Sequence, residues 1–427
     1  MQSRVVMFLA LSSFSVVNGQ VCDPMTLFAP EVRTQMGSAP NDIAASDFDG
    51  DGDLDLVIAG LTTGPRFFQV MLNNGDGSFA EPEEYSLISN PYCVTVADMN
   101  NDSYMDVVLG HGSIPDVSIA LGDGAGGFSP AVQYSAGGFA TISDIVAGDW
   151  DGDGFNDVAV VVNGNQIRTL LGDGAGGLEP QVTTLTFGVS VALAVADLNG
   201  DSDPDLVLGD QNGEVKVLFG GAQDQFSLQP GVDVGVFVQH LDLADMDMDG
   251  DLDVVVSGIL PSKIVVVENT GGGIMAIGPS QSIAIVPQGL ATADFDSDGY
   301  SDVVVAMSNS NAVALLRGNG DLTVEPQINF GAGSDNLRLL SGDLDGDGAP
   351  DVACASGSGL SVSVLLNTCG VGCPADITDD GMLNFFDVSA FLVAFTAKDP
   401  IADFTGDGVF NFFDVSAFLN AFAAGCP

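Results

Sequence analysis

Positive charge is what this 427-residue sequence has least of, with 9 Lys and Arg against 58 Asp and Glu and a formal net charge of −49. Nucleic-acid binding depends first on Lys and Arg that neutralise phosphate, so the composition excludes a nucleic-acid binder and a protein that binds anionic lipid through basic residues. An intrinsically disordered chain is excluded as well, because 46% of the residues are hydrophobic. The acidic residues must therefore serve local sites.

Long apolar runs are lacking too. The apolar run Val5–Val17 follows a short basic start and precedes a small-residue cleavage site at Val17-Asn18-Gly19, so residues 1–19 are predicted to be a signal peptide. No later segment reaches the about 18 uncharged apolar residues that a membrane span needs. We expect a mature protein that is secreted, either extracellular or at the cell surface, where cysteines are able to pair.

A motif of the form Asp-x-Asp/Asn-x-Asp-x-x-x-Asp recurs at intervals of 48 to 51 residues, and its seven copies begin at Asp47, Asp98, Asp149, Asp197, Asp245, Asp294 and Asp343. An apolar, β-branched run such as Asp302–Ala306 follows each copy, and a Gly-rich hairpin comes after it. About four short strands in each of seven repeats is the sequence signature of a β-propeller. We therefore predict an all-β, seven-bladed propeller over residues 20–370, followed by a small α-helical domain over residues 371–427.

These repeats resemble the FG-GAP, or VCBS, repeats of integrin-α-like propellers, and Asp151–Gly154 and Leu171–Gly177 are close matches. The resemblance covers about residues 22–369 and implies calcium binding. It is much less specific for biological role, because such propellers serve adhesion, carbohydrate binding and enzyme scaffolding.

The seventh repeat ends early, at Thr368-Cys369. Leu27–Val32 resembles Gly127–Val132 of an earlier hairpin, so the N-terminal segment is predicted to supply the missing outer strand of the last blade and to close the ring. Closure would bring Cys22 opposite Cys369, where we expect a disulfide; two free thiols are the alternative. Cys93 and Cys354 lie in strands of non-neighbouring repeats and are expected to be buried thiols.

Each propeller loop places side-chain oxygens at positions 1, 3, 5 and 9, and position 7 offers a backbone carbonyl. Ca²⁺ takes six to eight oxygen ligands, whereas zinc and copper sites would need Cys or His, which no loop contains. For a single loop a plain acidic turn is an equal alternative, but seven in register favour metal sites. The predicted side-chain ligands are Asp47, Asp49, Asp51 and Asp55; Asp98, Asn100, Asp102 and Asp106; Asp149, Asp151, Asp153 and Asp157; Asp197, Asn199, Asp201 and Asp205; Asp245, Asp247, Asp249 and Asp253; Asp294, Asp296, Asp298 and Asp302; and Asp343, Asp345, Asp347 and Asp351.

Positions 2 and 6 of the loops have different tasks. Position 6 needs a sharp backbone turn, which glycine supplies at 52, 154, 250, 299 and 348. Ser103 and Ser202 replace it in the second and fourth loops, where Asn100 and Asn199 also remove a carboxylate, so these two sites are predicted to be the weakest. Position 2 is apolar and is predicted to pack beneath each loop, as Phe48, Met99, Trp150, Leu198, Met246, Phe295 and Leu344. His111 and His240 lack a catalytic partner in the sequence and are expected to be ordinary strand or loop residues.

A second repeat, of 27 residues, follows Cys373. Both copies have the spacing of an EF-hand loop and are followed by a helix. The predicted ligands are Asp376, Thr378, Asp380, Asn384 and Asp387, and then Asp403, Thr405, Asp407, Asn411 and Asp414. Apolar residues recur at i, i+3, i+4 and i+7, which predicts that the helices bury one shared face made of Val388, Phe391, Leu392 and Phe395 with Val415, Phe418, Leu419 and Phe422.

This duplicated loop and helix resembles a dockerin of the kind bracketed by Gly-Cys, here Gly372-Cys373 and Gly425-Cys426. The resemblance implies a protein docking partner, cohesin-like or in the cell envelope. We expect Cys373 and Cys426 to pair, as a core this small would need. Thr378 and Thr405 depart from the usual Asn or Asp, which puts calcium affinity in doubt. Phe385-Phe386 and Phe412-Phe413 replace the small polar recognition residues of cellulosomal dockerins, so a cellulosome-type cohesin is not implied; we expect some of the four to pack inside.

The leading functional hypothesis is a secreted, non-enzymatic, calcium-binding adhesion or ligand-binding propeller with about nine Ca²⁺ sites, attached through the dockerin-like module to a protein partner or the cell surface. Its ligand would be a carbohydrate or a protein. The alternative is an exported polysaccharide-active hydrolase or lyase tethered by its dockerin. Against that alternative, 32 of the 58 acidic residues occupy loop ligand positions, and no remaining pair stands out as acid and nucleophile. A structural matrix protein without a soluble ligand is a third reading.

Overall fold

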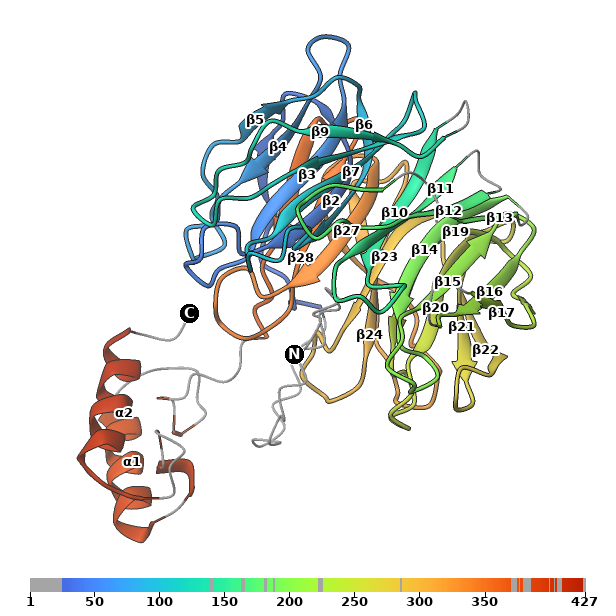
Figure 1. The fold of residues 1–427 in the computed structure, drawn as a ribbon. Helices are drawn as coiled ribbons and strands as arrows, with labels where there is room; N and C mark the ends of the chain where they lie inside the picture. Colours follow the sequence, from blue (N-terminus) through green and yellow to red (C-terminus); the bar gives the residue numbers. More distant parts are fainter. Residues whose placement is uncertain are drawn as a thin grey trace.

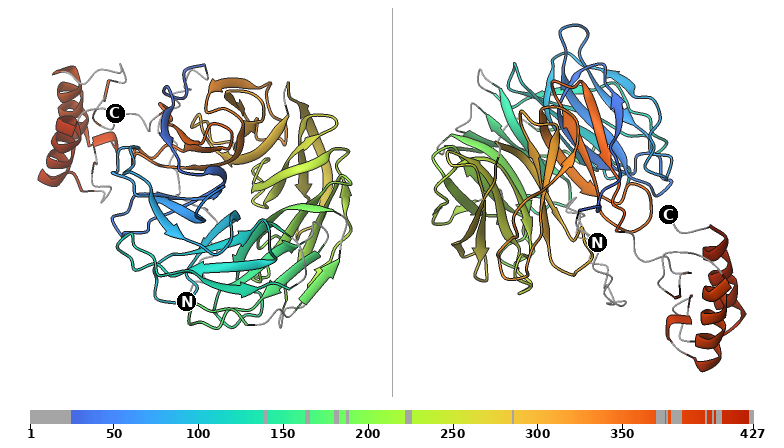
Figure 2. Two further views of the ribbon diagram at one scale, coloured as in Figure 1. Left: turned by 90° about the horizontal axis from the view of Figure 1, so that it is seen from above. Right: turned by 180° about the vertical axis from the view of Figure 1, so that it is seen from behind.

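Seven antiparallel sheets stand as blades around a central axis (Figures 1 and 2). The computed structural model describes residues 25–424 except for 138–140, 163–165, 180–182, 187–188, 222–225, 285, 370–374, 376, 379–384, 399, 403 and 405–408. The first strands of neighbouring blades contact one another around the ring, so they form its inner wall. The predicted seven-bladed, all-β fold with a small helical part after it is confirmed.

The strands follow the 49-residue repeat. The first three blades contain β2 (Ala39–Ser46), β3 (Asp55–Leu61), β4 (Phe67–Met71) and β5 (Glu83–Ser86); β6 (Pro91–Ala97), β7 (Asp106–His111), β8 (Asp116–Ala120) and β9 (Val132–Ser135); and β10 (Ile142–Gly148), β11 (Asp157–Val162), β12 (Gln166–Leu170) and β13 (Thr183–Thr186). The fourth and fifth contain β14 (Ser190–Ala196), β15 (Asp205–Asp210), β16 (Glu214–Phe219), β17 (Ser227–Leu228) and β18 (Val232–Asp233); and β19 (Phe237–Ala244), β20 (Asp253–Ile259), β21 (Lys263–Asn269) and β22 (Met275–Ser282).

The sixth blade contains β23 (Pro287–Ala293), β24 (Asp302–Met307), β25 (Ala312–Leu316) and β26 (Ile328–Gly331), and the seventh β27 (Asn336–Gly342), β28 (Asp351–Ser356), β29 (Ser361–Leu365) and, from the other end of the sequence, β1 (Val32–Gln35). The second strand of each blade is almost entirely buried. In β11 and β24, for example, every residue is buried, because both faces pack against neighbouring blades. Runs of Val, Ile and Leu suit such a position.

The N-terminal segment closes the ring, as predicted. β1 pairs antiparallel with β29, from Val32 opposite Val364 to Gln35 opposite Ser361. Ahead of it, the N–H of Ala29 donates to the carbonyl of Leu366 at 2.8 Å, and the N–H of Thr368 donates to the carbonyl of Leu27. Cys369 is buried and disulfide-bonded. Its predicted partner Cys22 lies outside the described residues, so that pairing stays a prediction.

Two helices make up the C-terminal part, α1 (Phe385–Ala397) and α2 (Phe412–Ala424), with a short 3-10 turn at Pro400–Ala402. The rings of Phe391 and Phe418 stack at the centre of their core, with centroids 4.0 Å apart. The predicted shared face is narrower than expected, because Leu392 and Leu419 are 52% and 50% exposed. A two-helix core is too small to cover the i+4 positions as well. No helix in the described part of the chain has the length and apolar character to cross a membrane.

Candidate metal centre

The seven aspartate loops lie between the first and second strands of the blades, all on one face of the ring. In each loop the position 1 carboxylate accepts the backbone N–H of position 6, over 2.8–3.1 Å. Position 6 has a positive φ in every loop, between +75° and +99°, which explains the preference for glycine there. Ser103 and Ser202 adopt the same conformation. The predicted turn chemistry is confirmed.

The position 9 aspartate is buried in every loop and anchors it at two points. One oxygen accepts the N–H of position 2 over 2.8–3.0 Å. The other accepts an N–H at the end of the third strand of the same blade or just after it, over 2.6–2.8 Å. An oxygen that accepts a single N–H keeps a further lone pair. In the sixth loop, Oδ2 of Asp302 also accepts the N–H of Asp296 at 3.3 Å. Position 9 therefore shapes the loop while still offering an oxygen to a cation.

Burial raises the pKa of the position 9 carboxylates in six of the loops, the first, the second and the fourth to seventh, against the opposing effect of the two backbone hydrogen bonds. The pKa of Asp55 rises to about 6, that of Asp253 to about 7 and that of Asp302 to about 8. Negative neighbours in the same loop add to the effect. A folded loop without a cation thus favours protonation, and a bound cation would relieve the same electrostatic cost.

Five loops bring three carboxylates together so that one oxygen of each lies within 4.8 Å of the others. The groups are Asp47, Asp49 and Asp55; Asp149, Asp151 and Asp157; Asp245, Asp247 and Asp249; Asp294, Asp296 and Asp302; and Asp343, Asp345 and Asp347. Ligands about 2.3–2.6 Å from a common Ca²⁺ lie within such a spacing. The second and fourth loops, which contain Asn100 and Asn199, form no such carboxylate group within the described residues. That these two are the weaker sites stays a prediction.

Unsatisfied oxygens support the fit to a cation. Oδ1 of Asp245 and Oδ1 of Asp296 are buried and have no hydrogen-bond partner. A buried, unpaired carboxylate oxygen is costly unless a cation or donor reaches it. Position 5 is less consistent: Asp249 and Asp347 belong to the carboxylate groups, whereas Asp51, Asp153 and Asp298 are exposed and do not. Hard oxygen donors of this kind suit calcium.

The loops also connect neighbouring blades. The backbone carbonyl of Phe48, at position 2, accepts the N–H of Gly126 in the outer turn of the next blade at 3.0 Å. The carbonyls of Met99 and Met246 are held in the same way from the next blade. Asn side chains do so for others, as when Nδ2 of Asn73 donates to the carbonyl of Leu344 across the ring closure at 2.8 Å. The order of a loop is therefore coupled to the joint between two blades.

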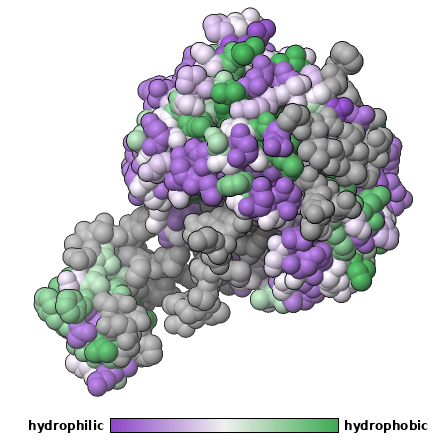
Figure 3. Space-filling model, viewed as in Figure 1, coloured by the Kyte–Doolittle hydropathy of each residue, from purple (hydrophilic) through white to green (hydrophobic). Residues whose placement is uncertain are grey.

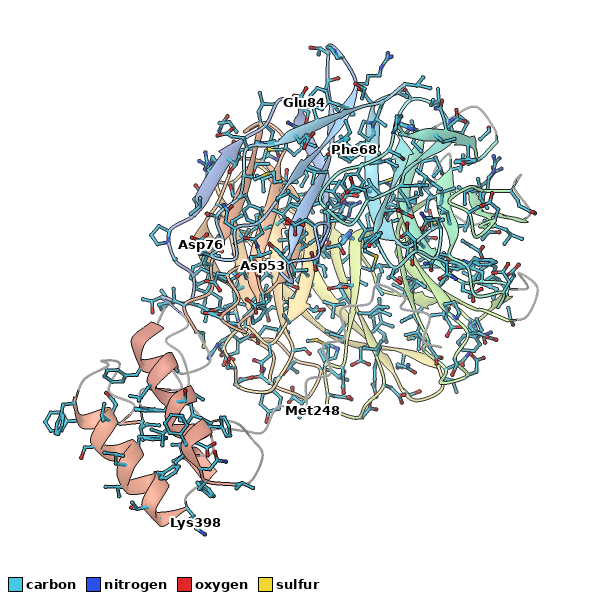
Figure 4. The ribbon with its side chains drawn as sticks, turned by 60° about the vertical axis from the view of Figure 1, so that its left-hand side comes forward. Asp53, Phe68, Asp76, Glu84, Met248 and Lys398 are labelled. Atoms are coloured by element: carbon cyan, nitrogen blue, oxygen red, sulfur yellow. The ribbon has the colours of Figure 1, made fainter. Side chains whose placement is uncertain are left out.

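Figure 4 shows the two kinds of turn on this face. Asp53, at position 7 of the first loop, lies near Asp76 in the outer turn of the same blade, whereas Phe68 and Glu84 lie toward the opposite end of the blade. A Cβ on Gly75, beside Asp76, would lie 2.5 Å from a carboxylate oxygen of Asp53. The outer turns are thus packed directly against the aspartate loops.

The apolar position 2 residues are buried, including Trp150 at 2% exposure, which confirms their role in the core. The two free cysteines of the described chain, Cys93 and Cys354, are buried as predicted. Nε2 of His111 lies 2.7 Å from Oγ of Ser118, but both residues are buried. Nδ1 of His240 accepts the N–H of Leu290 at 3.4 Å. These are the interactions of ordinary strand histidines.

Sequence reasoning missed three aspartates that join the inner strands of successive blades. Oδ2 of Asp42 accepts the N–H of Val94, and Oδ2 of Asp144 accepts that of Leu193, over 2.9 and 2.8 Å. Asp242 accepts from both the N–H and the hydroxyl of Thr292. None of them belongs to the repeated motif. The only signal was their place five, five and three residues before an aspartate loop.

In the C-terminal part the structure describes four of the predicted ligands, Thr378, Asp387, Asn411 and Asp414, and the two carboxylates among them are engaged by the chain itself. Oδ1 of Asp387 accepts the hydroxyl and the N–H of Thr378, over 2.7 and 3.1 Å. Oδ2 of Asp414 accepts the N–H of Asn411 at 2.7 Å. The other predicted ligands lie outside the described residues, namely Asp376, Asp380, Asn384, Asp403, Thr405 and Asp407. The predicted Cys373–Cys426 pair also lies outside them.

Apolar residues lie on the surface of the helical pair beside hydrophilic ones (Figure 3). The expectation that some of the paired phenylalanines pack inside is wrong. Phe385, Phe386, Phe412 and Phe413 are 76%, 68%, 76% and 69% exposed, because each pair begins its helix, outside the core around Phe391.

Comparison with known proteins agrees with the fold. The chain is 30% identical over 159 residues to integrin alpha-V of Gallus gallus, an alignment that covers 32% of this chain and 15% of that protein. The chain thus matches only a small part of the integrin's length. The crystal structure of BBS1N in complex with ARL6DN, soaked with lead, superposes with a TM-score of 0.58 at 14% identity, covering 80% of this chain and 97% of that one. The form soaked with mercury gives 0.57 at 15% identity, covering 81% and 98%.

The sequence model of the FG-GAP-like repeat matches residues 47–109, 98–160, 150–208, 197–256 and 294–354. Each matched segment runs from one aspartate loop through the end of the next one. The matches together cover more than half of the chain, which therefore belongs to the FG-GAP-repeat proteins.

Proposed function

We propose that this protein is a secreted, non-enzymatic propeller that binds Ca²⁺ in its aspartate loops and uses the stabilised ring to bind a ligand outside the cell. The observation that carries the proposal is the set of five carboxylate groups, each with three oxygens within 4.8 Å. The likeness to integrin alpha-V supports ligand binding and an extracellular or surface location. The C-terminal module, as a dockerin-like domain, would anchor the chain.

Calcium would act here as a structural ion. The residues that would hold it are the position 1, 3, 5 and 9 aspartates, with the asparagines at position 3 of the second and fourth loops. Bound Ca²⁺ supplies positive charge that offsets carboxylate repulsion within a loop. Because the loop backbone holds the next blade, as at Phe48 and Gly126, filling the loops would stiffen the joints between blades. About nine ions would bind per chain, seven in the propeller and two in the module.

The ligand class is either carbohydrate or protein, and one experiment separates these from catalysis. The full-length chain is applied to a glycan array in millimolar-range calcium and again in EDTA, and reducing sugar released from each positive glycan is measured. Retention that needs calcium, without sugar release, supports a carbohydrate-binding propeller. Release of reducing sugar contradicts the non-enzymatic proposal and favours the tethered hydrolase or lyase. Calcium-dependent stability without glycan retention directs the search to protein ligands.

Anchoring is tested separately on the producing cells. The full-length chain and a form truncated after Cys369 are expressed, and the fraction retained on the cells is compared with the fraction released into the medium. Release of the truncated form alone supports the anchor. Equal retention of both forms contradicts it.

A further inference from the structure

The sixth aspartate loop has an arginine of the chain beside its carboxylates. Nη1 of Arg317 lies 3.3 Å from Oδ2 of Asp296, the position 3 aspartate. Nη2 of the same guanidinium pairs with Glu325, which is 41% exposed at its side chain. Asp296 itself is fully buried, whereas the position 3 residues of the other six loops are only partly buried. A positive charge thus reaches one of the three carboxylates that Ca²⁺ would need.

The other blades have a different residue at this place. Arg317 precedes Gly318, whose N–H anchors the position 9 aspartate, and the equivalent residues are Leu72, Leu121, Leu171, Phe219, Glu268 and Leu366. Leu72 packs against Gly126, and Leu121 against Gly176, each a glycine in the outer turn of the next blade.

Among the described residues the sixth blade has no such glycine turn beside it, because β29 of the seventh blade is followed by Thr368 and its outer strand β1 comes from the N-terminal segment. An apolar side chain after β25 would therefore have no glycine turn of the described residues to pack against. Arg317 instead pairs with Asp296 in the aspartate loop of its own blade.

We propose that Arg317 is a built-in cation of the sixth loop that weakens calcium binding there and holds the loop in its folded shape when calcium is absent. The inference rests on the proposed calcium binding. Two cations that share Asp296 compete, and their competition is strong because the carboxylate is removed from water. Oδ1 of Asp296 stays buried and unpartnered, so the loop keeps an oxygen for calcium. The sixth loop is thereby less dependent on calcium than the other four carboxylate groups.

The test replaces Arg317 with leucine, the residue found at this place in four other blades, in the full-length chain. Arg66→Leu is the matched control, since Arg66 is exposed and donates only to the carbonyl of Ile88 outside the loops. Retained calcium is measured by plasma emission after dialysis against a series of fixed free calcium concentrations. The melting temperature is measured in EDTA.

We expect Arg317→Leu to bind one ion per chain about 10- to 100-fold more tightly than wild type, the range of a lost charge-assisted interaction. In EDTA it should melt several degrees below Arg66→Leu, while Arg317→Lys, which keeps the charge, should lie between. Retained calcium and melting temperatures that match the Arg66→Leu control would overturn the role of Arg317. Wild type and variant that both bind no calcium would instead overturn the proposed function, so the two failures are distinguishable.

Discussion

Replacing Ser103 with glycine is expected to stabilise the propeller. Ser103 has a φ of +75° at the loop position where Gly154 has +91° and Gly250 has +93°. A left-handed conformation costs an L-residue about 1–2 kcal/mol relative to glycine. Glycine also has more conformational freedom in the unfolded chain, which lowers the free energy of unfolding by about 0.4–1 kcal/mol and offsets part of that gain. At the midpoints of these two ranges the net stabilisation is about 0.8 kcal/mol, and the 2.9 Å bond from the N–H of residue 103 to Asp98 is retained.

The reverse change is the control. A Cβ on Gly250 would meet nothing within 4 Å, so Gly250→Ser tests the backbone conformation without a steric clash. It should lose about as much stability as Ser103→Gly gains, about 0.8 kcal/mol. Urea unfolding of both variants, in EDTA and in calcium, measures the free energies. A destabilised Ser103→Gly, or a neutral Gly250→Ser, would refute the argument that position 6 is selected for its positive φ.

Three further predictions concern the ring and the module. Burial raises the pKa of Asp42 from 3.8 to about 6, so this carboxyl binds a proton more readily in the folded state than in the unfolded state. The stability of wild type relative to Asp42→Asn should therefore fall as pH rises from about 4 to 6 and stay constant above pH 6. A difference in melting temperature that does not change across that range would contradict this. Peptide mapping without reductant should recover Cys22 joined to Cys369, and Cys22→Ser should lower the melting temperature; a free Cys22 thiol in exported protein would remove the link. Phe412→Ser should abolish retention on the producing cells without changing the melting temperature, because the ring is 76% exposed.

The fold was largely predictable because one motif repeats seven times. The positions of its aspartates set the strand boundaries, since position 9 is the first residue of the second strand in every blade, as Asp55 begins β3 and Asp351 begins β28. The closing strand was predictable because Leu27–Val32 repeats a hairpin pattern that the seventh blade lacks. In each case a local pattern was compared with other copies of itself.

Features that depend on a neighbouring blade were not predictable. Asp42 and Asp144 join inner strands about 50 residues apart in sequence, and a single sequence does not show which N–H they face. The ion pair of Arg317 with Asp296 likewise depends on the missing turn of the seventh blade. In the helical module the apolar spacing predicted Leu392 and Leu419 to be buried, because periodicity gives the direction of a face and not the amount of protein available to cover it.

The calcium content of the full-length chain tests the central claim most directly. After dialysis into millimolar-range calcium and removal of free ion, plasma emission should find about nine Ca²⁺ per chain. Asp245→Asn combined with Asp247→Asn should lose one ion, whereas the matched pair Asp116→Asn and Asp233→Asn, outside the loops, should lose none. Two ions or fewer on the wild-type chain, or equal contents in the two double variants, would contradict calcium binding by the aspartate loops.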